Sequence, residues 1–114
     1  MSNQAGTTDI TAFLEKMKRL ISAGKYDFVP RRKNMQALAQ HGLTIADAKD
    51  EMLGLAVGDY HKGLKQDFNP NRPGDVWEFK KVVDGTQFYV KVKVVQENGE
   101  DILKCLGFHE DDFA

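Results

Sequence analysis

Apolar residues recur every three or four positions in the first part of the chain. From Asp9 to Ala23 this spacing predicts an amphipathic helix that is capped by Thr8 or Asp9 and ended by Gly24. The apolar stripe consists of Ile10, Phe13, Leu14, Met17, Leu20 and Ile21. Residues 1–8 are mostly polar and lack this pattern, so we expect them to be disordered.

Two shorter helices are predicted to follow. The first spans Asn34 to His41 and is ended by Gly42. The second begins at Thr44, because Thr44-x-x-Asp47 has the form of a capping box with Asp in place of Glu. It ends near Gly54.

After residue 75 the pattern changes to the alternation that is typical of strands. The predicted strands are Val76–Val83, Gln87–Val95 and Ile102–Phe108. The Asp84-Gly85 pair between the first two favours a two-residue type I′ turn. Such a turn places Val83 opposite Thr86 and fixes the register of the hairpin.

This register sorts the side chains of the hairpin onto two faces. The polar face carries the cross-strand pairs Lys80–Tyr89, Glu78–Lys91 and Val76–Lys93. The apolar face carries Trp77, Phe79, Phe88, Val90 and Val92. Helices followed by such strands predict an α+β fold, with the N-terminal helices packed on one face of a small antiparallel sheet. We expect residues 9–114 to form a single domain.

The length of the second turn decides which face receives His109. A two-residue Asn98-Gly99 turn places His109 on the apolar face. A three-residue loop shifts the pairing by one, which places His109 beside Tyr89 and turns Leu106 and Phe108 toward the helices. We expect the three-residue loop because it buries more apolar surface.

Composition and charge narrow the class of protein. With 114 residues, 41% hydrophobic and 29% charged, the chain fits one globular domain. Its net charge of −1 argues against a protein that coats nucleic acid by bulk electrostatics. It has no apolar run long enough to cross a membrane and no signal-peptide pattern. The single cysteine, Cys105, favours a reducing, cytoplasmic compartment, and its place in a strand predicts a buried small hydrophobe.

The charges are unevenly distributed along the chain. From Lys16 to Lys33 there are seven basic residues and one acid, Asp27. Arg31 and Arg32 belong to this segment, whereas the C-terminal stretch is acidic. A basic segment fits a short contact with a phosphate chain, an acidic protein partner or a solvated helix face, and the last is the most common.

The polar face of the hairpin contains the groups that cleavage of RNA requires. Glu78 or His109 would take the proton from a ribose 2′-hydroxyl, a lysine would stabilise charge on the phosphate, and an acid would protonate the leaving 5′-oxygen. Because the nucleophile belongs to the substrate, we expect neither a metal nor a cofactor.

Each of these residues also has an ordinary structural interpretation. Glu78 and Lys91 would form a surface ion pair worth under about 1 kcal/mol. Tyr89 is a common strand residue, and His109 precedes an acidic tail. On residue types and spacing alone, these interpretations are the more common ones.

Six short segments have a distinctive order and spacing. They are YDFVPRRKN at 26–34, LTIAD at 43–47, GDYHKG at 58–63, GDVWEF at 74–79, YVKVK at 89–93 and KCLGFHE at 104–110. Together they resemble the MqsR-type toxins of the broader RelE/ParE-like group, over roughly residues 10–113.

The resemblance implies a RelE-like sheet with helices on one face, endoribonuclease activity on mRNA and a neutralising antitoxin partner. The catalytic positions of the family correspond here to Lys62, Glu78, Tyr89 and His109. Glu78 stands where the best-known member has glutamine, and His109 stands where it has lysine, so the individual roles are open. The phosphate-binding residues that we expect beside them are Lys80, Lys91, Lys93, Arg31 and Arg32.

Two other functions are compatible with the same fold. A RelE/ParE-like chain can act on a protein target such as gyrase, and a non-catalytic binding module would retain only the scaffold. If the chain is an endoribonuclease, its partners are mRNA, either free or on the ribosome, and a cognate antitoxin. No membrane and no small-molecule cofactor is expected.

Overall fold

The computed structural model describes residues 6–66 and 75–110, with the backbone alone at 62–66 and 75. Its elements are α1 (Thr7–Ser22), β1 (Tyr26–Phe28), α2 (Arg32–His41), α3 (Ile45–Leu53), the short 3-10 helix η1 (Val57–Asp59), β2 (Tyr60–Gln66), β3 (Asp75–Val83), β4 (Thr86–Glu97) and β5 (Glu100–Glu110). No helix within these ranges is long and apolar enough to span a membrane.

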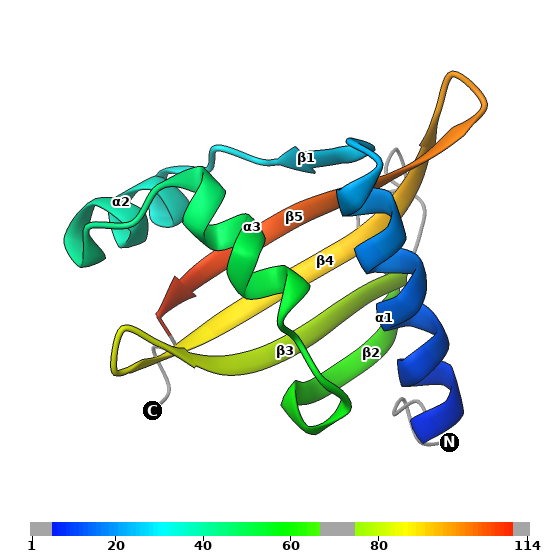
Figure 1. Cartoon of the computed structure of the whole chain (residues 1–114), viewed down its shortest axis with the longest axis horizontal. Coiled ribbons are helices and arrows are strands. Elements are labelled where there is room, and N and C mark those ends of the chain that lie inside the picture. Colours follow the sequence, from blue (N-terminus) through cyan, green and yellow to red (C-terminus); the bar gives the residue numbers. More distant parts are fainter. Residues whose placement is uncertain (1–5, 67–74, 111–114) are drawn as a thin grey trace.

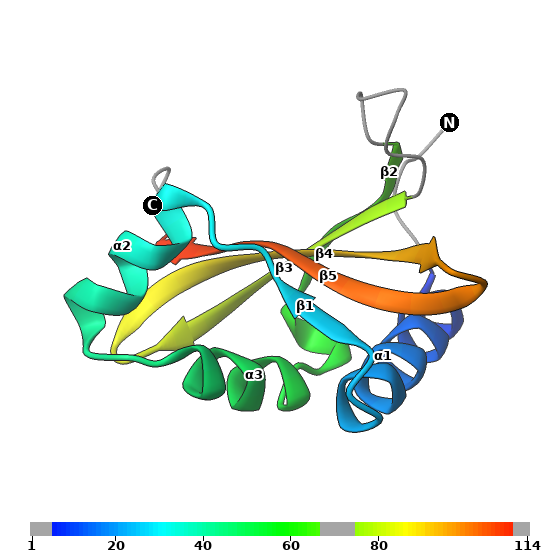
Figure 2. The same ribbon diagram turned by 90° about the horizontal axis from the view of Figure 1, so that it is seen from above.

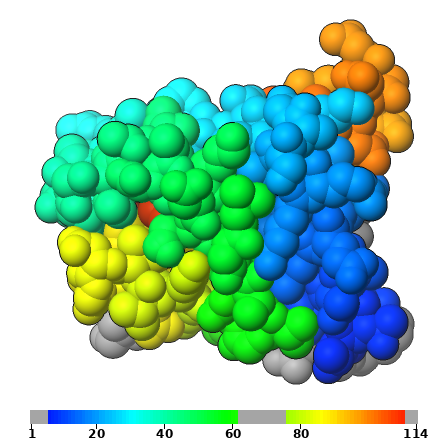
Figure 3. All heavy atoms as spheres, viewed as in Figure 1, coloured from blue at the N-terminus to red at the C-terminus, as the bar shows by residue number. Residues whose placement is uncertain are grey.

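The strands of the described ranges form one sheet in the order β1-β5-β4-β3-β2. All neighbours are antiparallel except β1, which runs parallel to β5. Helices α1 and α3 lie on one side of the sheet, whereas α2 lies at its edge beside β5 (Figures 1 and 2). Seen from this side, the helices cover most of the sheet (Figure 3). The predicted α+β class is confirmed.

The first helix begins two residues earlier than predicted. The carbonyl of Gly6 accepts a hydrogen bond from the Ile10 amide at 3.0 Å, which closes an additional turn. Gly6 is therefore the N-cap, and the prediction that Thr8 or Asp9 caps the helix is wrong. Thr8, which we expected to be disordered, is helical, while residues 1–5 lie outside the described residues.

The other two helices follow the predicted signals closely. Helix α2 begins at Arg32, two residues before the predicted start, and Gly42 ends it as predicted. The capping box of α3 is confirmed. The Thr44 hydroxyl accepts from the Asp47 amide at 3.1 Å, and the Asp47 carboxylate accepts from the Thr44 amide at 2.9 Å.

The β3–β4 hairpin has the predicted register. Val83 pairs with Thr86, and the ladder continues through Lys80–Tyr89 and Glu78–Lys91. Asp84 and Gly85 have φ values of 51° and 73°, which a type I′ turn requires at both central positions. Strands β1 and β2 were not predicted.

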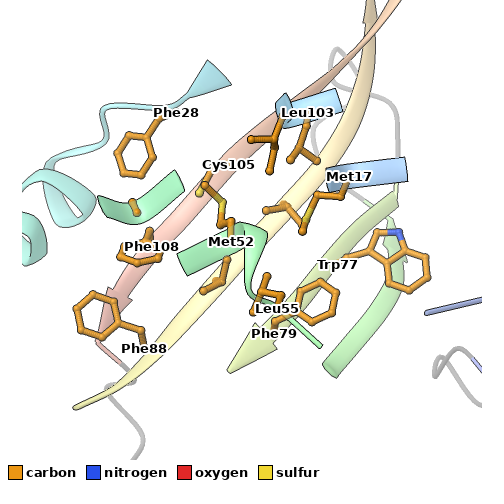
Figure 4. Packing of buried hydrophobic residues seen from close by; sticks show 14 of the residues in the cluster. Met17, Phe28, Met52, Leu55, Trp77, Phe79, Phe88, Leu103, Cys105 and Phe108 are labelled. Atoms are coloured by element: carbon orange, nitrogen blue, oxygen red, sulfur yellow. The ribbon is translucent and has the colours of Figure 1, made fainter. Parts of the chain in front are cut away.

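The hydrophobic core fills the space between the sheet and the helices (Figure 4). Its residues come from every layer and include Met17, Met52, Leu55, Trp77, Phe79, Phe88, Leu103, Cys105 and Phe108. Phe13 of α1 stacks on Trp77 with ring centroids 4.3 Å apart. Cys105 is fully buried, as predicted, and its burial raises the pKa of the thiol to about 12.

Strand β5 contains a bulge that the sequence did not indicate. Glu97 pairs with Glu100, so the second turn has two residues and the predicted three-residue loop is wrong. The register holds as far as Val92–Cys105 and then shifts, because Lys91 pairs with Gly107. Leu106 is the extra residue. The one-residue shift that was expected in the turn therefore occurs inside the strand.

Candidate active site on the polar face

We use "polar face" for the side of the sheet that carries Glu78, Lys80, Tyr89, Lys91 and His109. Strand residues alternate between faces, and these side chains alternate with core residues such as Phe79, Phe88 and Val90. Beyond the bulge, His109 pairs with Tyr89, so it lies on the polar face as predicted.

Tyr89 lies at the centre of a cluster of aromatic and basic side chains. The His109 ring is nearly parallel to the Tyr89 ring, with centroids 6.0 Å apart and an interplanar angle of 7°. On the other side, the His61 ring lies 6.0 Å away at 73°. Lys80 Nζ and Lys91 Nζ lie 6.0 Å and 5.8 Å from the Tyr89 ring centroid. The cluster therefore combines two imidazoles and two ammonium groups within a small area.

Glu78 is buried, unlike the surface residue that an ordinary cross-strand pair would contain. Only 2% of its side chain is exposed, and its Oε1 lies 3.7 Å from Lys91 Nζ. Its Oε2 has no hydrogen-bond partner within the part of the chain that the structure describes. A buried carboxylate is costly without a cation nearby, so Glu78 and Lys91 hold each other in place.

The hydrogen bond of His109 determines which of its nitrogens is available. Its Nδ1 lies 2.9 Å from the carbonyl oxygen of Glu110. A carbonyl only accepts, so Nδ1 carries the hydrogen, and a neutral His109 has its lone pair on Nε2. Two residues earlier on the same strand, Gly107 leaves room for the imidazole. A Cβ there would lie 3.3 Å from Lys91 Cβ and 3.6 Å from His109 Nε2.

Asn34 holds the bulge that brings His109 to this face. It is 1% exposed, and its Nδ2 donates to the carbonyl oxygens of Val29 at 3.0 Å and Leu106 at 3.1 Å. Its Oδ1 accepts from the Phe108 amide at 2.9 Å. The side chain thus satisfies the carbonyl of the bulge residue and an amide just after it. Asn34 was not among the predicted site residues, although its helical spacing with Ala37 places it on the buried side of α2.

His61, whose ring lies near that of Tyr89, is the second residue that was not among the predicted site residues. Tyr60 pairs with Phe79 and Lys62 pairs with Glu78, so His61 is an extra residue in β2. The Tyr60 ring packs against the Trp77 and Phe79 rings at 6.1 Å. The only available signal was the adjacency of an aromatic, a histidine and a lysine, in a segment that was not predicted to be a strand.

The remaining predicted residues are Lys62, Lys93, Arg31 and Arg32. Lys62 pairs with Glu78 in the backbone register, and its side chain lies outside the described side chains. Lys93 is 2% exposed and lies opposite Lys104, so it is not a surface residue. Arg31 and Arg32 are exposed at the start of α2.

His41 connects α2 to the ends of two strands. Its Nδ1 lies 3.0 Å from Asp84, and its Nε2 lies 2.8 Å from Glu110. The hydrogen bonds with Asp84 and then Glu110 raise the pKa of His41 above 6.5. His41 thereby holds the residue that follows His109.

Two comparisons with known proteins bear on the family of this chain. A search of curated proteins finds no match. A family profile described as "Motility quorum-sensing regulator, toxin of MqsA" matches residues 11–110. The matched segment runs from α1 through β5 and contains the whole Tyr89 cluster. The chain therefore belongs to the MqsR toxin family and is the toxin of a toxin–antitoxin system, with a cognate antitoxin as its partner.

Proposed function

We propose that this toxin is an endoribonuclease that cleaves mRNA by attack of a ribose 2′-hydroxyl on the adjacent phosphate. The observation that carries the proposal is the cluster in which His61, His109, Lys80 and Lys91 surround Tyr89. Imidazoles transfer protons near neutral pH, and ammonium groups stabilise charge that develops on a phosphate.

The lysines of the cluster would bind the scissile phosphate. Lys80 and Lys91 both approach the Tyr89 ring, so a phosphate above this ring would meet two cations at once. The aromatic ring offers a stacking surface for an unpaired base. Arg31 and Arg32 lie at the start of α2, which contacts β5, and would hold flanking phosphates. Lys93 is too deeply buried for this role.

The base in this proposal is His109 rather than Glu78. The Nε2 of a neutral His109 carries a lone pair, whereas the Glu78 carboxylate is buried beside Lys91. Nε2 takes the 2′-hydroxyl proton, the 2′-oxygen bonds to phosphorus, and the 5′-oxygen leaves. Glu78 then acts as a positioning residue for Lys91. Lys62 enters the proposal through its match to the family and its register position alone.

The test is cleavage of a defined mRNA by the purified chain with EDTA present, with and without ribosomes. We expect products with 2′,3′-cyclic phosphate and 5′-hydroxyl ends. His109→Gln should lower the rate by about 100- to 10,000-fold, because it removes the base. Lys91→Met should also lower it, while Lys18→Met on α1, with the same change in charge, should not.

Two outcomes would overturn the proposal. One is intact RNA in both reactions while expression of the chain still arrests growth, which would point to a protein target. The other is cleavage that His109→Gln leaves unchanged in a folded protein.

A further inference from the structure

We infer that His61 is the general acid of this reaction and works as the partner of His109. The inference rests on the proposed ribonuclease function and adds a residue to it. The residues predicted from the sequence include a base and cations. None of them was assigned to deliver a proton to the leaving oxygen.

The two histidines come from strands that lie on opposite sides of β4, the strand that carries Tyr89. His61 comes from β2 and His109 from β5, and each ring centroid is 6.0 Å from that of Tyr89. The imidazoles are therefore no further apart than twice this distance. In phosphoryl transfer the attacking and leaving oxygens lie roughly in line across phosphorus, so the base and the acid must approach from opposite sides. A phosphate bound above Tyr89 would meet one imidazole on each side.

The arrangement also assigns the two roles. His109 donates from Nδ1 to the Glu110 carbonyl, which leaves Nε2 as an acceptor when the ring is neutral. The acid must then be another group, because one imidazole cannot start the same step both neutral and protonated. On the polar face, the charged and titratable groups that the neighbouring strands place near Tyr89 include Glu78 and Lys80 on β3, Lys91 on β4, and His109 on β5.

Of the groups around Tyr89, an imidazolium is best suited to give up a proton near neutral pH. Lysine and tyrosine side chains ordinarily hold their protons to a much higher pH. Glu78 is buried against Lys91 and is not presented to a substrate. His61 is half-buried and its ring forms a T-shaped pair with the Tyr89 ring, so it is within reach of the same phosphate.

Local backbone geometry supports a dedicated position for His61. It is the extra residue of a bulge in β2, just as Leu106 is the extra residue of the bulge in β5 that sets the face of His109. Bulges change the direction of side chains and are common beside active sites. Tyr60 packs against Trp77 and Phe79 and so anchors the strand immediately before His61.

The complete step is balanced in protons and bonds. His109 Nε2 accepts the 2′-hydroxyl proton as the bond between the 2′-oxygen and phosphorus forms. The bond between phosphorus and the 5′-oxygen breaks, and the His61 imidazolium gives its proton to that oxygen. The products are a 2′,3′-cyclic phosphate and a 5′-hydroxyl. Exchange with water then returns both histidines to their starting states.

The test compares an ordinary RNA with one in which sulfur replaces the bridging 5′-oxygen at the cleavage site. A thiolate leaves without being protonated, so the loss of the acid matters only for the oxygen substrate. His61→Gln should cleave ordinary RNA about 100- to 10,000-fold more slowly than wild type. It should cleave the sulfur substrate within about tenfold of wild type, because the general acid is then no longer needed. His109→Gln should be slow on both substrates.

The pH dependence provides a second readout that a purely structural role would not produce. Wild type should show a bell-shaped profile, and His61→Gln should lose the fall in rate on the alkaline side. His41 is the matched histidine outside the cluster. His41→Gln should leave the ratio of the cleavage rates on the two substrates as it is in wild type. If His61→Gln is equally slow on both substrates, or cleaves ordinary RNA at nearly the wild-type rate, His61 is not the acid. If wild-type protein cleaves neither substrate, the proposed function itself fails.

Discussion

The two faces of the sheet use alternate residues of the same strands for different purposes. Along β3, Trp77 and Phe79 pack against helices, whereas their neighbours Glu78 and Lys80 belong to the polar face. The helix-covered face consists of apolar side chains that are almost entirely buried. The polar face gathers basic and aromatic groups around Tyr89. One face therefore supplies stability, and the other is left to carry chemistry.

This separation depends on which residues of each strand point to which face of the sheet. In β5 the alternation alone would place His109 on the wrong face, and one extra residue at Leu106 corrects it. The difference between the faces is thus maintained by register shifts in β2 and β5, while the regular ladder of β3 and β4 requires none.

The largest effect that we expect comes from a pair of adjacent substitutions on β3. Phe79→Ala should lower the free energy of unfolding by about 3–5 kcal/mol, because Phe79 is fully buried in the core. Lys80→Ala should change the free energy of unfolding by less than about 1 kcal/mol but should slow RNA cleavage. Urea denaturation and cleavage rates measure the two effects. Equal losses of stability would show that the two faces are not separate in function.

The next largest effect concerns Asn34, whose side chain holds the bulge in β5. Asn34→Leu should cost about 2–4 kcal/mol, because it leaves the Leu106 carbonyl and the Phe108 amide buried without their partner. Cleavage should fall further than the loss of folded protein explains, since His109 would no longer be held on the polar face. Hydrogen exchange at the Phe108 amide should accelerate.

The matched control for Asn34 is Gln36→Ala on the same helix, at an exposed position. It should leave stability, exchange and cleavage nearly unchanged. If the cleavage rate per folded molecule of Asn34→Leu equals that of wild type, the bulge keeps its register without this side chain.

The smallest effect is a pH dependence at the edge of the sheet. The raised pKa of His41 means that its ties to Asp84 and Glu110 stabilise the fold fully below about pH 6.5. This contribution is lost as the pH rises through the raised pKa of the folded state. The difference in Tm between wild type and His41→Gln should therefore shrink from acidic to alkaline pH. A difference that is constant with pH would contradict this assignment.

Two local signals in the sequence were informative. Thr44 and Asp47 predicted a capping box, and the Asp84-Gly85 turn predicted the pairing of Lys80 with Tyr89. The positions of the catalytic candidates on β3 and β4 followed from that one turn. These features are predictable because all the groups involved lie within a few residues of each other or are counted from a single turn.

Features that depend on distant contacts were not predicted. Strand β1 has only three residues, and its partner β5 lies far along the chain. The bulge at Leu106 depends on Asn34, 72 residues earlier. His61 could not be placed beside Tyr89 because β2 itself was missed. Reasoning from the second turn reached the right face for His109 through the wrong feature, since the shift occurs in the strand.

The order of the strands has a consequence for the timing of synthesis. Strand β5 follows β1, β2, β3 and β4 in the chain but lies between β1 and β4 in the sheet. A ribosome that is making the protein therefore releases β1 long before its partner exists. The residues from β2 to β4 can pair earlier, yet they lack His109. On the proposed function, the nascent chain has no base for cleavage until Glu110 has been translated, so an unfinished chain cannot cleave the message that encodes it.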